Sequence, residues 1–441
     1  MSVERRGSIK SSIRVTQPHS VREEVTLSTK PFVISKRRVV EAYRLVKANA
    51  GSAGVDRQSI ASFEENLKDN LYKLWNRMSS GSYMPPPVLA VPIPKKSGGE
   101  RLLGVPTVSD RIAQMVVKLE FEPLVEPHFL PDSYGYRPNK SALDAVGVTR
   151  KRCWDNDWVV EFDIKGLFDN IPHDLLLKAV EKHTDSAWIR LYVRRWLTAP
   201  MQLSDGTRQE RSKGAPQGGV ISPLLSNLYL HYVFDKWLQQ HYPHIVWCRY
   251  ADDGLLHCRS EAQAKFLLKV IGQRFEQCGL ELHPVKTKIV YCKDERRTGE
   301  YTNTSFDFLG FCFRRRGCWV ASQKRMILGF TPAVSQDSLK AMRVKIRKSR
   351  LRQRTDLSLN DIAAWLNPVM SGWLNYYGRF YRSAMYSIIR HVNKTLGRWA
   401  RSKFKALRRG RTRSVEFFER CLRQSPRLFV HWREGMTGAF A

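Results

Sequence analysis

The sequence predicts a mixed α/β (α+β) fold for most of the chain and an all-α region at its C-terminal end. Short apolar or alternating runs, which are typical of strands, occur at 88–94, 159–164, 246–258 and 306–313. Helical patterns separate these runs. After Thr331 the strand pattern stops, and the chain becomes basic and rich in Trp and Tyr. These observations predict a domain boundary near residue 330.

The N-terminal part predicts helices followed by a stiff linker. One helix begins after Ser35, a residue type that caps helix N-termini, and a second spans about 62–79. The consecutive prolines 85–87 then favour an extended linker. One side of the first helix is expected to carry Val39, Val40, Tyr43 and Val46.

A hairpin and several helix starts come next. The run 88–94 alternates as a strand, and Ser97-Gly98-Gly99 is typical of the turn that leads to a return strand. Ser109, Pro172 and Ser222 stand where helices begin, because Ser caps an N-terminus and Pro is tolerated in the first turn.

The last strands and the first C-terminal helix also leave clear signals. The run 246–258 is predicted to form two short strands joined at 251–254. Ser358 with Asp361 is a capping box, which predicts a helix N-terminus. The apolar stripe of that helix consists of Leu366, Met370, Trp373, Tyr377 and Phe380.

Charge is the main bulk property. The chain has 74 Lys and Arg against 41 Asp and Glu, a formal net charge of +33. Residues 341–441 contain 23 Lys and Arg against 5 Asp and Glu, so this quarter supplies +18 of that excess. Such a charge repels itself unless a polyanion neutralises it, which favours nucleic acid as the partner.

Other classes are disfavoured. We find no apolar run near the roughly 20 residues that span a bilayer, so no membrane association is expected. The N-terminus lacks the apolar segment of a secretory signal, and residues 1–34 are interpreted as a basic arm. The eight cysteines form no C-x-x-C pair, which disfavours a structural zinc site, and we expect reduced, mostly buried thiols in a cytoplasmic protein.

Three carboxylates are placed for metal chemistry. Alternation along Trp158 to Ile164 puts Asp163 on the face opposite Phe162 and Ile164. Asp252 and Asp253 are adjacent at a tight turn between apolar strands, where a shared cation would offset their repulsion. Two Mg²⁺ ions could activate a hydroxyl and stabilise a leaving pyrophosphate, with Asp163 and Asp252 bridging them and Asp253 in support. A lone Asp-Asp turn is usually structural, so the combination carries the interpretation.

Three longer segments carry a family resemblance. Tyr250-Ala251-Asp252-Asp253 resembles the catalytic box of reverse transcriptases, and the run 162–171 resembles their first-aspartate motif. Between them, Gly214 to Leu225 is similar to the nucleotide-pocket motif of group II intron reverse transcriptases. The resemblance implies a right-hand polymerase fold with fingers, an antiparallel palm sheet and a helical thumb. It also implies a metal site at Asp163, Ile164, Asp252 and Asp253, with Mg²⁺ as cofactor and Mn²⁺ as a possible substitute.

The resemblance also implies a deoxynucleotide pocket. Lys95 and Arg101, in a segment similar to the family's fingertip hairpin, would grip the triphosphate. Phe168 would exclude a 2′-hydroxyl. The pocket would further include Ala215, Gln217, Gly218 and Lys286. Without the resemblance, Lys95 and Arg101 would be interpreted as part of a solvated hairpin tip, and Phe168 as an ordinary core residue. The segment around Gly218 would be interpreted as a plain loop, and Lys286 as a solvated side chain.

Two segments outside the core boxes favour group II intron proteins. Ser133 to Pro138 is similar to their second motif, and Ser371 to Tyr377 resembles their maturase, or thumb, signature. Such proteins bind their intron RNA, promote its splicing and copy it after insertion into DNA. The implied partners are the intron RNA, an RNA template with DNA primer, target DNA and deoxynucleotides, and the protein is expected as a monomer or homodimer near the nucleoid. After residue 400 only Cys421 and His431 remain, so we expect no metal-bound endonuclease domain.

Exposed cations in the C-terminal region are the candidate nucleic-acid contacts, although a charge run is often only a solvated face. They are Lys345, Arg347, Lys348, Arg350, Arg352, Arg354, Arg401, Lys403, Lys405, Arg408 and Arg409.

Two alternative functions are kept beside that of an intron-encoded reverse transcriptase. They are a splicing-only maturase with a dead polymerase site, and a reverse transcriptase of a bacterial defence or CRISPR-associated system. A polymerase that copies RNA into RNA is disfavoured by Phe168.

The motifs also predict how the chain is divided. The expected parts are an arm (1–34), an N-terminal extension with fingers (35–155), a palm (156–325), a thumb or maturase domain (331–400) and a basic nucleic-acid-binding segment (401–441).

Overall fold

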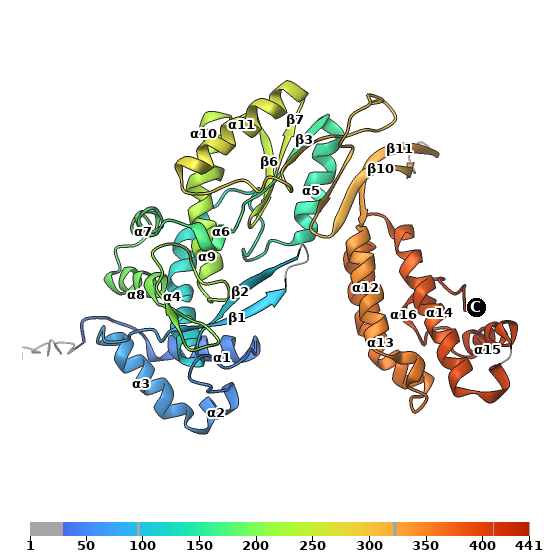
Figure 1. Ribbon diagram of the computed structural model, residues 1–441, viewed down its shortest axis with the longest axis horizontal. Helices are drawn as coiled ribbons and strands as arrows, with labels where there is room; N and C mark the ends of the chain where they lie inside the picture. The colour runs from blue at the N-terminus through green and yellow to red at the C-terminus, as the bar shows by residue number, and fades with distance from the viewer. Residues whose placement is uncertain (1–29, 95–97, 321–323, 409, 441) are drawn as a thin grey trace, which may run out of the picture.

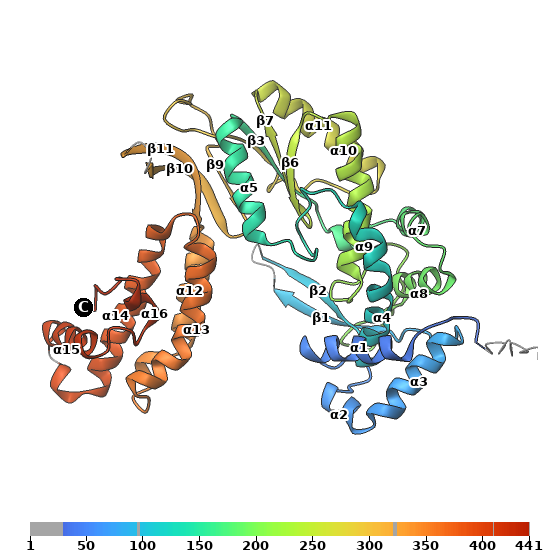
Figure 2. The same cartoon turned by 180° about the vertical axis from the view of Figure 1, so that it is seen from behind.

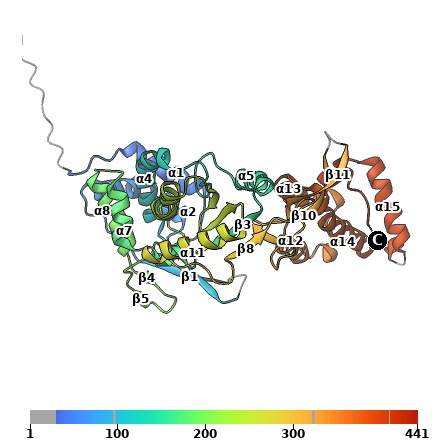
Figure 3. The same ribbon diagram turned by 90° about the horizontal axis from the view of Figure 1, so that it is seen from above.

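The computed structural model describes residues 30–94, 98–320, 324–408 and 410–440. It confirms a mixed α/β arrangement, with three sheets and helices around them (Figure 1). The α/β part lies on one side, and the C-terminal helices lie on the other. Strands β9–β11 and helix α5 lie between the two, as the view from behind also shows (Figure 2). From above, the parts follow one another along the long axis of the molecule (Figure 3).

The N-terminal helices pack on a long buried helix. They are α1 (Lys36–Ala48), α2 (Ile60–Glu65) and α3 (Leu67–Ser79), and the long helix is α4 (Val108–Val125), whose N-cap is Thr107.

Two expectations for this part need correction. Val40 is 37% exposed, because it cannot share a helix face with its neighbour Val39, whereas Ala42 takes its place in the core. The single helix expected at 62–79 is two helices, since the backbone leaves helical geometry at Asn66. Ser35 stands at the N-cap of α1, but its side chain makes no capping hydrogen bond.

The expected hairpin belongs to the first sheet. Strands β1 (Val88–Pro94) and β2 (Glu100–Val105) pair antiparallel, and β1 also pairs with β4 (Met201–Gln202), which pairs with β5 (Arg208–Gln209). The strand order is β2-β1-β4-β5.

The second sheet is central and antiparallel, with the order β6-β7-β3-β8. Along β3, Val160 and Phe162 pack toward α11, while Val159 packs toward α5, so the sheet is covered on both faces (Figures 1 and 3). Side chains alternate, so Asp163 shares the α5 side with Val159. The elements are α5 (Ala142–Asp155), β3 (Trp158–Asp163), β6 (Val246–Tyr250), β7 (Asp253–Cys258), α11 (Glu261–Gln277) and β8 (Lys288–Tyr291).

The remaining helices of the α/β part enclose the same hydrophobic core. Helix α9 begins at Ser222, as expected, and continues into a π-helix at His231–Asp235. The others are a 3-10 turn (Glu126–His128), α6 (Leu167–Asn170), α7 (His173–Glu181), α8 (Ala187–Thr198) and α10 (Lys236–His241).

The third sheet corrects the expectation of one strand at 306–313. That run is β9 (Ser305–Phe308) and the start of β10 (Phe311–Val320), joined by a tight turn at Leu309 and Gly310, whose φ angles are 51° and 81°. β10 pairs with β11 (Arg325–Val334), so β structure continues past residue 331 and the helices begin only at Gln336.

The C-terminal helical region, residues 336–440, has its own core. Phe418, Trp432 and Phe440 pack with Leu396 and Trp399, so the segment after residue 400 shares one core with the helices before it. The capping box of Ser358 and Asp361 is confirmed at the start of α13. The helices are α12 (Gln336–Lys348), α13 (Leu359–Tyr377), α14 (Tyr386–Lys403), α15 (Arg411–Gln424) and α16 (Val430–Arg433), with 3-10 turns at Leu351–Gln353, Arg382–Met385 and Lys405–Leu407.

Two further properties bear on the expectations. The cysteines are free thiols, five of them buried and three partly exposed. Among the described residues, no helix has the length and apolar character needed to cross a membrane.

Candidate active site

The central sheet brings the three predicted aspartates together. Asp163 ends β3 and stands opposite Asp253, the first residue of β7, in the antiparallel register. Tyr250 and Asp253 are paired across the β6–β7 hairpin, so Ala251 and Asp252 form its turn. Ala251 has a φ of 56°, in the left-handed region that costs an L-residue about 1–2 kcal/mol. We call residues 250–253 the aspartate turn.

The carboxylates at this turn carry more negative charge than their surroundings neutralise. Burial, together with the nearby carboxylates of Asp252 and Asp163, raises the pKa of Asp253 to about 8. Burial also raises the pKa of Asp252. The ammonium of Lys286 lies 3.1 Å from both carboxylate oxygens of Asp163, and its side chain is 53% exposed. A cation of higher charge would therefore be stabilised here.

The donor set fits divalent metal ions that are completed by a substrate. Oxygen ligands suit Mg²⁺, which usually takes one or two carboxylates together with substrate phosphates and water. Within the described part of the chain, no group of three or more His, Cys, Asp or Glu side chains forms a ready-made metal cage. Ile164 is 1% exposed and apolar, so only its main-chain oxygen could serve as a ligand.

A buried ion pair supports the aspartate turn from behind, and it was not predicted from the sequence. Arg249 and Asp235 are both fully buried, with Nε donating to Oδ1 at 2.8 Å. The same guanidinium donates to the main-chain oxygen of Ala251 at 3.0 Å and to Oδ1 of Asn227 at 3.0 Å. Arg249 was identifiable only as a charged residue inside an otherwise apolar strand.

The segment Ser133 to Pro138 lies directly against this turn. The main-chain N–H of Tyr134 donates to the carbonyl of Arg249 at 2.8 Å. A Cβ on Gly135 would lie 2.4 Å from the main-chain nitrogen of Ala251, so only glycine permits this approach. The motif therefore has a role in supporting the turn, which its sequence did not reveal.

The loop 214–219 meets both the first sheet and the α6 segment. The N–H of Gly104 donates to the carbonyl of Gln217 at 2.6 Å, and the N–H of Ala215 donates to the carbonyl of Phe168 at 2.7 Å. Gly218 has a φ of 113°, and a Cβ there would lie 2.4 Å from the carbonyl oxygen of Gly104. The predicted pocket residues of this loop are thus brought beside Phe168.

The side chains of the expected pocket differ in exposure. Phe168 and Gln217 are half-buried, Ala215 is buried, and Arg101 is exposed on β2. Lys95 lies outside the described residues.

A second buried network holds the 214–219 loop and was missed from the sequence. Gln114 accepts hydrogen bonds from the N–H groups of Val220, at 2.7 Å, and Ile221, at 3.3 Å. Its amide donates to Asp110 at 2.9 Å, and burial raises the pKa of Asp110 to about 6. Both residues lie on one face of α4, which looked like an ordinary core helix.

The expected nucleic-acid contacts divide into exposed and structural cations. Arg347 and Lys348 are exposed in the last turn of α12. Lys403 instead donates to the carbonyls of Thr355 and Leu357, both at 2.8 Å, and so holds that loop in place. Arg354 pairs with Asp356, and Arg401 donates to Ser414. Exposed members of the set also include Lys345, Arg350, Arg352, Lys405 and Arg408, whereas Arg409 lies outside the described residues.

Comparison with known proteins places these features in a family. Residues 93–313 match the reverse transcriptase (RNA-dependent DNA polymerase) family, and residues 339–416 match the group II intron maturase-specific domain. Protein YkfC of Escherichia coli is 32% identical over 297 residues, which cover 58% of this chain and 77% of that protein.

Two further relatives match over shorter stretches. The group II intron-encoded protein LtrA of Lactococcus lactis is 33% identical over 202 residues, 45% of this chain and 33% of that protein. The putative COX1/OXI3 intron 1 protein of Saccharomyces cerevisiae is 34% identical over 172 residues, 39% of this chain and 20% of that protein. The matched segment thus spans a third or less of these two proteins. The family matches and the aspartate turn agree, and the chain belongs to the reverse transcriptases, the RNA-dependent DNA polymerases, with a group II intron maturase-specific domain.

Proposed function

We propose that this reverse transcriptase extends a DNA primer on an RNA template and binds group II intron RNA, promoting its splicing and its insertion into target DNA (retrohoming). The observation that carries the polymerase site is the aspartate turn, where Asp253 faces Asp163, and where burial together with the negative charges of Asp252 and Asp163 raises the pKa of Asp253 to about 8. The maturase-specific match at 339–416 supports the intron RNA as partner.

Asp163 and Asp252 would hold two Mg²⁺ ions, or Mn²⁺ in their place, with the main-chain oxygen of Ile164. When bound, these ions would activate the primer 3′-hydroxyl and neutralise the leaving pyrophosphate. Asp253, opposite Asp163, would keep the other two carboxylates in position. Lys286 neutralises Asp163 in the absence of substrate, and its exposed ammonium would contact the incoming nucleotide.

The deoxynucleotide would bind between β2 and the 214–219 loop. Lys95 and Arg101 would bind its triphosphate, and Ala215, Gln217 and Gly218 would form the floor of the pocket. The half-buried ring of Phe168 would close the space that a 2′-hydroxyl needs. The hydrogen bond from Ala215 to the carbonyl of Phe168 supports this, because it fixes the ring's backbone next to the loop.

We propose that the α/β part forms the fingers and palm of a right-hand polymerase and that residues 336–440 form its thumb. The basic face of this region would contact phosphates of the intron RNA, the template duplex and target DNA. Its exposed Arg347 and Lys348 are the leading contacts. Lys403, which already bonds two carbonyls, would act through loop position instead. The protein would work as a monomer or homodimer at the nucleoid, where its substrates are.

Primer extension tests the proposal. Wild type and Asp252→Ala would be given an annealed RNA template and DNA primer, Mg²⁺ and deoxynucleotides, with Asp205→Ala in the exposed β4–β5 loop as a charge-matched control. We expect extension by wild type and the control, and none by Asp252→Ala. If none of the three extends the primer while tight binding to structured intron RNA persists, the splicing-only reading replaces this proposal.

A further inference from the structure

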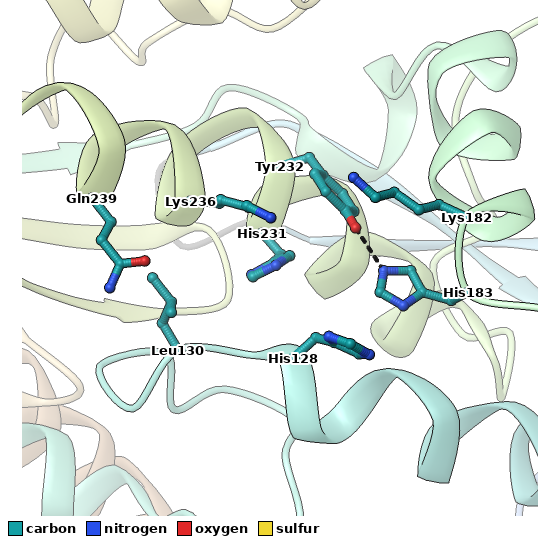
Figure 4. A pocket seen from close by; sticks show the side chains of 8 residues that line it. All are labelled: His128, Leu130, Lys182, His183, His231, Tyr232, Lys236 and Gln239. Atoms are coloured by element: carbon teal, nitrogen blue, oxygen red, sulfur yellow. Dashed lines mark hydrogen bonds between the residues drawn. The ribbon is translucent and has the colours of Figure 1, made fainter.

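A polar cavity lies apart from the aspartate turn. It has a volume of about 430 Å³ and is bounded by the Glu126–His128 turn, the end of α7, the π-helix and α10 (Figure 4). Among the described residues that line the cavity, none belongs to the aspartate site and none is acidic. We call this space the basic cavity and define it by six of its lining side chains: His128, Lys182, His183, His231, Tyr232 and Lys236.

Contacts between these side chains hold their polar groups around one space. Nε2 of His183 lies 2.7 Å from the hydroxyl of Tyr232, and the rings of His183 and His128 have centroids 4.7 Å apart. The ammonium groups of Lys182 and Lys236 lie 5.0 Å and 6.0 Å from the centre of the Tyr232 ring. Both ammonium groups therefore lie within cation–π distance of one aromatic ring at the cavity.

Among the described residues that line the basic cavity, none carries a negative charge that could neutralise the lysines. Asp235, on the same π-helix, is fully buried and paired with Arg249. At the cavity's edges, Glu126 pairs with Arg137 at 2.8 Å. Burial lowers the pKa of His183, and the charges of His128, Lys182 and Lys236 lower it further, so the neutral imidazole is favoured there and the lysines carry the positive charge of the cavity.

His231 provides a second, independent observation. Its side chain lines the cavity although the residue is only 3% exposed, and its Nδ1 has no hydrogen-bond partner. A buried polar atom without a partner is costly and usually marks a ligand or an unseen water. The residue also begins a π-helix, a backbone irregularity that is frequent at functional sites.

The charges decide what kind of ligand fits. Three histidines could suggest a transition metal, but two flanking ammonium groups disfavour a cation, and the described residues contain no arrangement of His, Cys, Asp and Glu that could hold one. An anion would offset the charges of the two lysines and accept hydrogen bonds from their ammonium groups and from imidazole N–H groups. The volume is that of a small-molecule site and is too small to hold a nucleic-acid duplex.

We propose that the basic cavity binds the phosphate of one nucleotide unit, either a free nucleotide or a residue of single-stranded RNA, at a site separate from the polymerase centre. The ring edges of His128 and Tyr232 would contact the sugar or base. This inference does not depend on the proposed polymerase reaction, because binding can be measured without extension.

Histidine modification by diethyl pyrocarbonate, mapped by mass spectrometry, can test the site in the full chain. His128 is exposed at the cavity, and the exposed His244 serves as an internal reference elsewhere on the surface. The probes are uridine, uridine monophosphate and tetrauridylate. The variant Lys182→Gln/Lys236→Gln removes both ammonium groups. The control Lys265→Gln/Lys269→Gln removes the same charge from the exposed side of α11.

At about four times its dissociation constant, a phosphorylated probe should lower modification of His128 about fivefold and leave His244 unchanged. The protection should persist in the α11 control, disappear in the cavity variant, and be absent with uridine. Protection by the monophosphate alone would identify a free nucleotide, and protection by tetrauridylate at lower concentration would identify an RNA strand. No protection by either, equal protection by uridine, or protection that survives in the cavity variant would each overturn the proposal. Primer extension by the cavity variant separates this outcome from failure of the polymerase proposal.

Discussion

Buried carboxylates lie on both sides of the aspartate turn, but the charges that surround them differ. Behind the turn, Asp235 is fully buried and is neutralised by Arg249, whose guanidinium also bonds the carbonyl of Ala251. In front of it, Asp163 and Asp253 face each other across the strands, and the contacting cation is the half-exposed Lys286. Arg249 on β6 and Asp253 on β7 represent the two sides and are close in the sequence, on either side of the hairpin turn.

This difference separates a charge that is neutralised within the fold from charges that are left without a buried partner. A buried carboxylate with a buried partner is satisfied within the fold, so the Asp235 pair fixes a backbone geometry. Carboxylates without enough partners make the protein less stable, and they persist where a ligand supplies the missing charge. The ion pair thus holds the strained Ala251 in place, while Asp252 and Asp253 remain available to a cation.

Breaking the pair behind the turn should have the largest effect on stability. Arg249→Met leaves Asp235 buried without a partner, which costs about 3–5 kcal/mol. It also removes the hydrogen bond to Ala251, so the turn loses its support. We expect a matching drop in the free energy of unfolding in urea and a loss of primer extension.

A double variant sharpens this result. Arg249→Met with Asp235→Leu removes both charges and should recover much of the stability, because a buried pair often gives little net stabilisation over apolar residues. It should not recover activity, since Ala251 still lacks its donor. The control is Lys293→Met, whose partner Glu300 is exposed, with an expected change within about 1 kcal/mol. Full recovery of activity by the double variant would contradict the supporting role of Arg249.

The front of the turn should respond to pH in the opposite sense from a paired carboxylate. The pKa of Asp253 is about 8 in the folded protein against an ordinary value of 3.8. Between these values the folded state holds a proton that the unfolded state has lost, so stability falls as pH rises through this window. Asp253→Asn should remove that decline and stabilise the metal-free protein near pH 8 by about 1 kcal/mol or more.

Urea unfolding across pH 5–9 in EDTA measures this effect. Added Mg²⁺ should flatten the wild-type decline, because the ions favour the charged carboxylates, and should have little effect on the variant. Asp294→Asn is a useful contrast. Hydrogen bonds from Arg297 lower the pKa of Asp294, so its contribution to stability is lost at acid pH instead. A wild-type protein that is equally stable from pH 5 to pH 8 would show that the front carboxylates are neutralised by other means.

Much of the front of the site was predictable because it is local. Alternation along β3 placed Asp163 opposite Phe162, and the adjacent Asp252 and Asp253 indicated a hairpin turn, which the antiparallel pairing of β6 with β7 confirms. The β1–β2 hairpin and the start of α13 were likewise fixed by short-range signals. The predicted roles of the individual pocket residues remain proposals.

The support behind the site was not predictable, because it depends on contacts between distant segments. Asp235 lies on a helix, Arg249 on a strand and Gly135 in a loop, and only tertiary packing joins them. The split of 306–313 has a different cause, because the closely spaced Phe residues on both sides of Leu309 and Gly310 resemble one strand and hid the turn between them. A glycine that must accept a close backbone approach has no local signature that distinguishes it from one in a plain loop.

Gly218 gives the smallest but most specific test of how the front of the site is built. Gly218→Ala combines a φ of 113° with a Cβ that would lie 2.4 Å from the carbonyl oxygen of Gly104. Gly206→Ala is a matched control, because its φ is 88° and nothing lies within 4 Å of its Cβ. Each should lose about 1 kcal/mol from backbone strain. Only Gly218→Ala should also displace the loop from β2. The KM for deoxynucleotides should then rise several-fold, which corresponds to a loss of about 1 kcal/mol in the free energy of binding. Equal KM values for the two variants would mean that the contact between Gly218 and Gly104 has no part in nucleotide binding, and that the loop meets its substrate elsewhere.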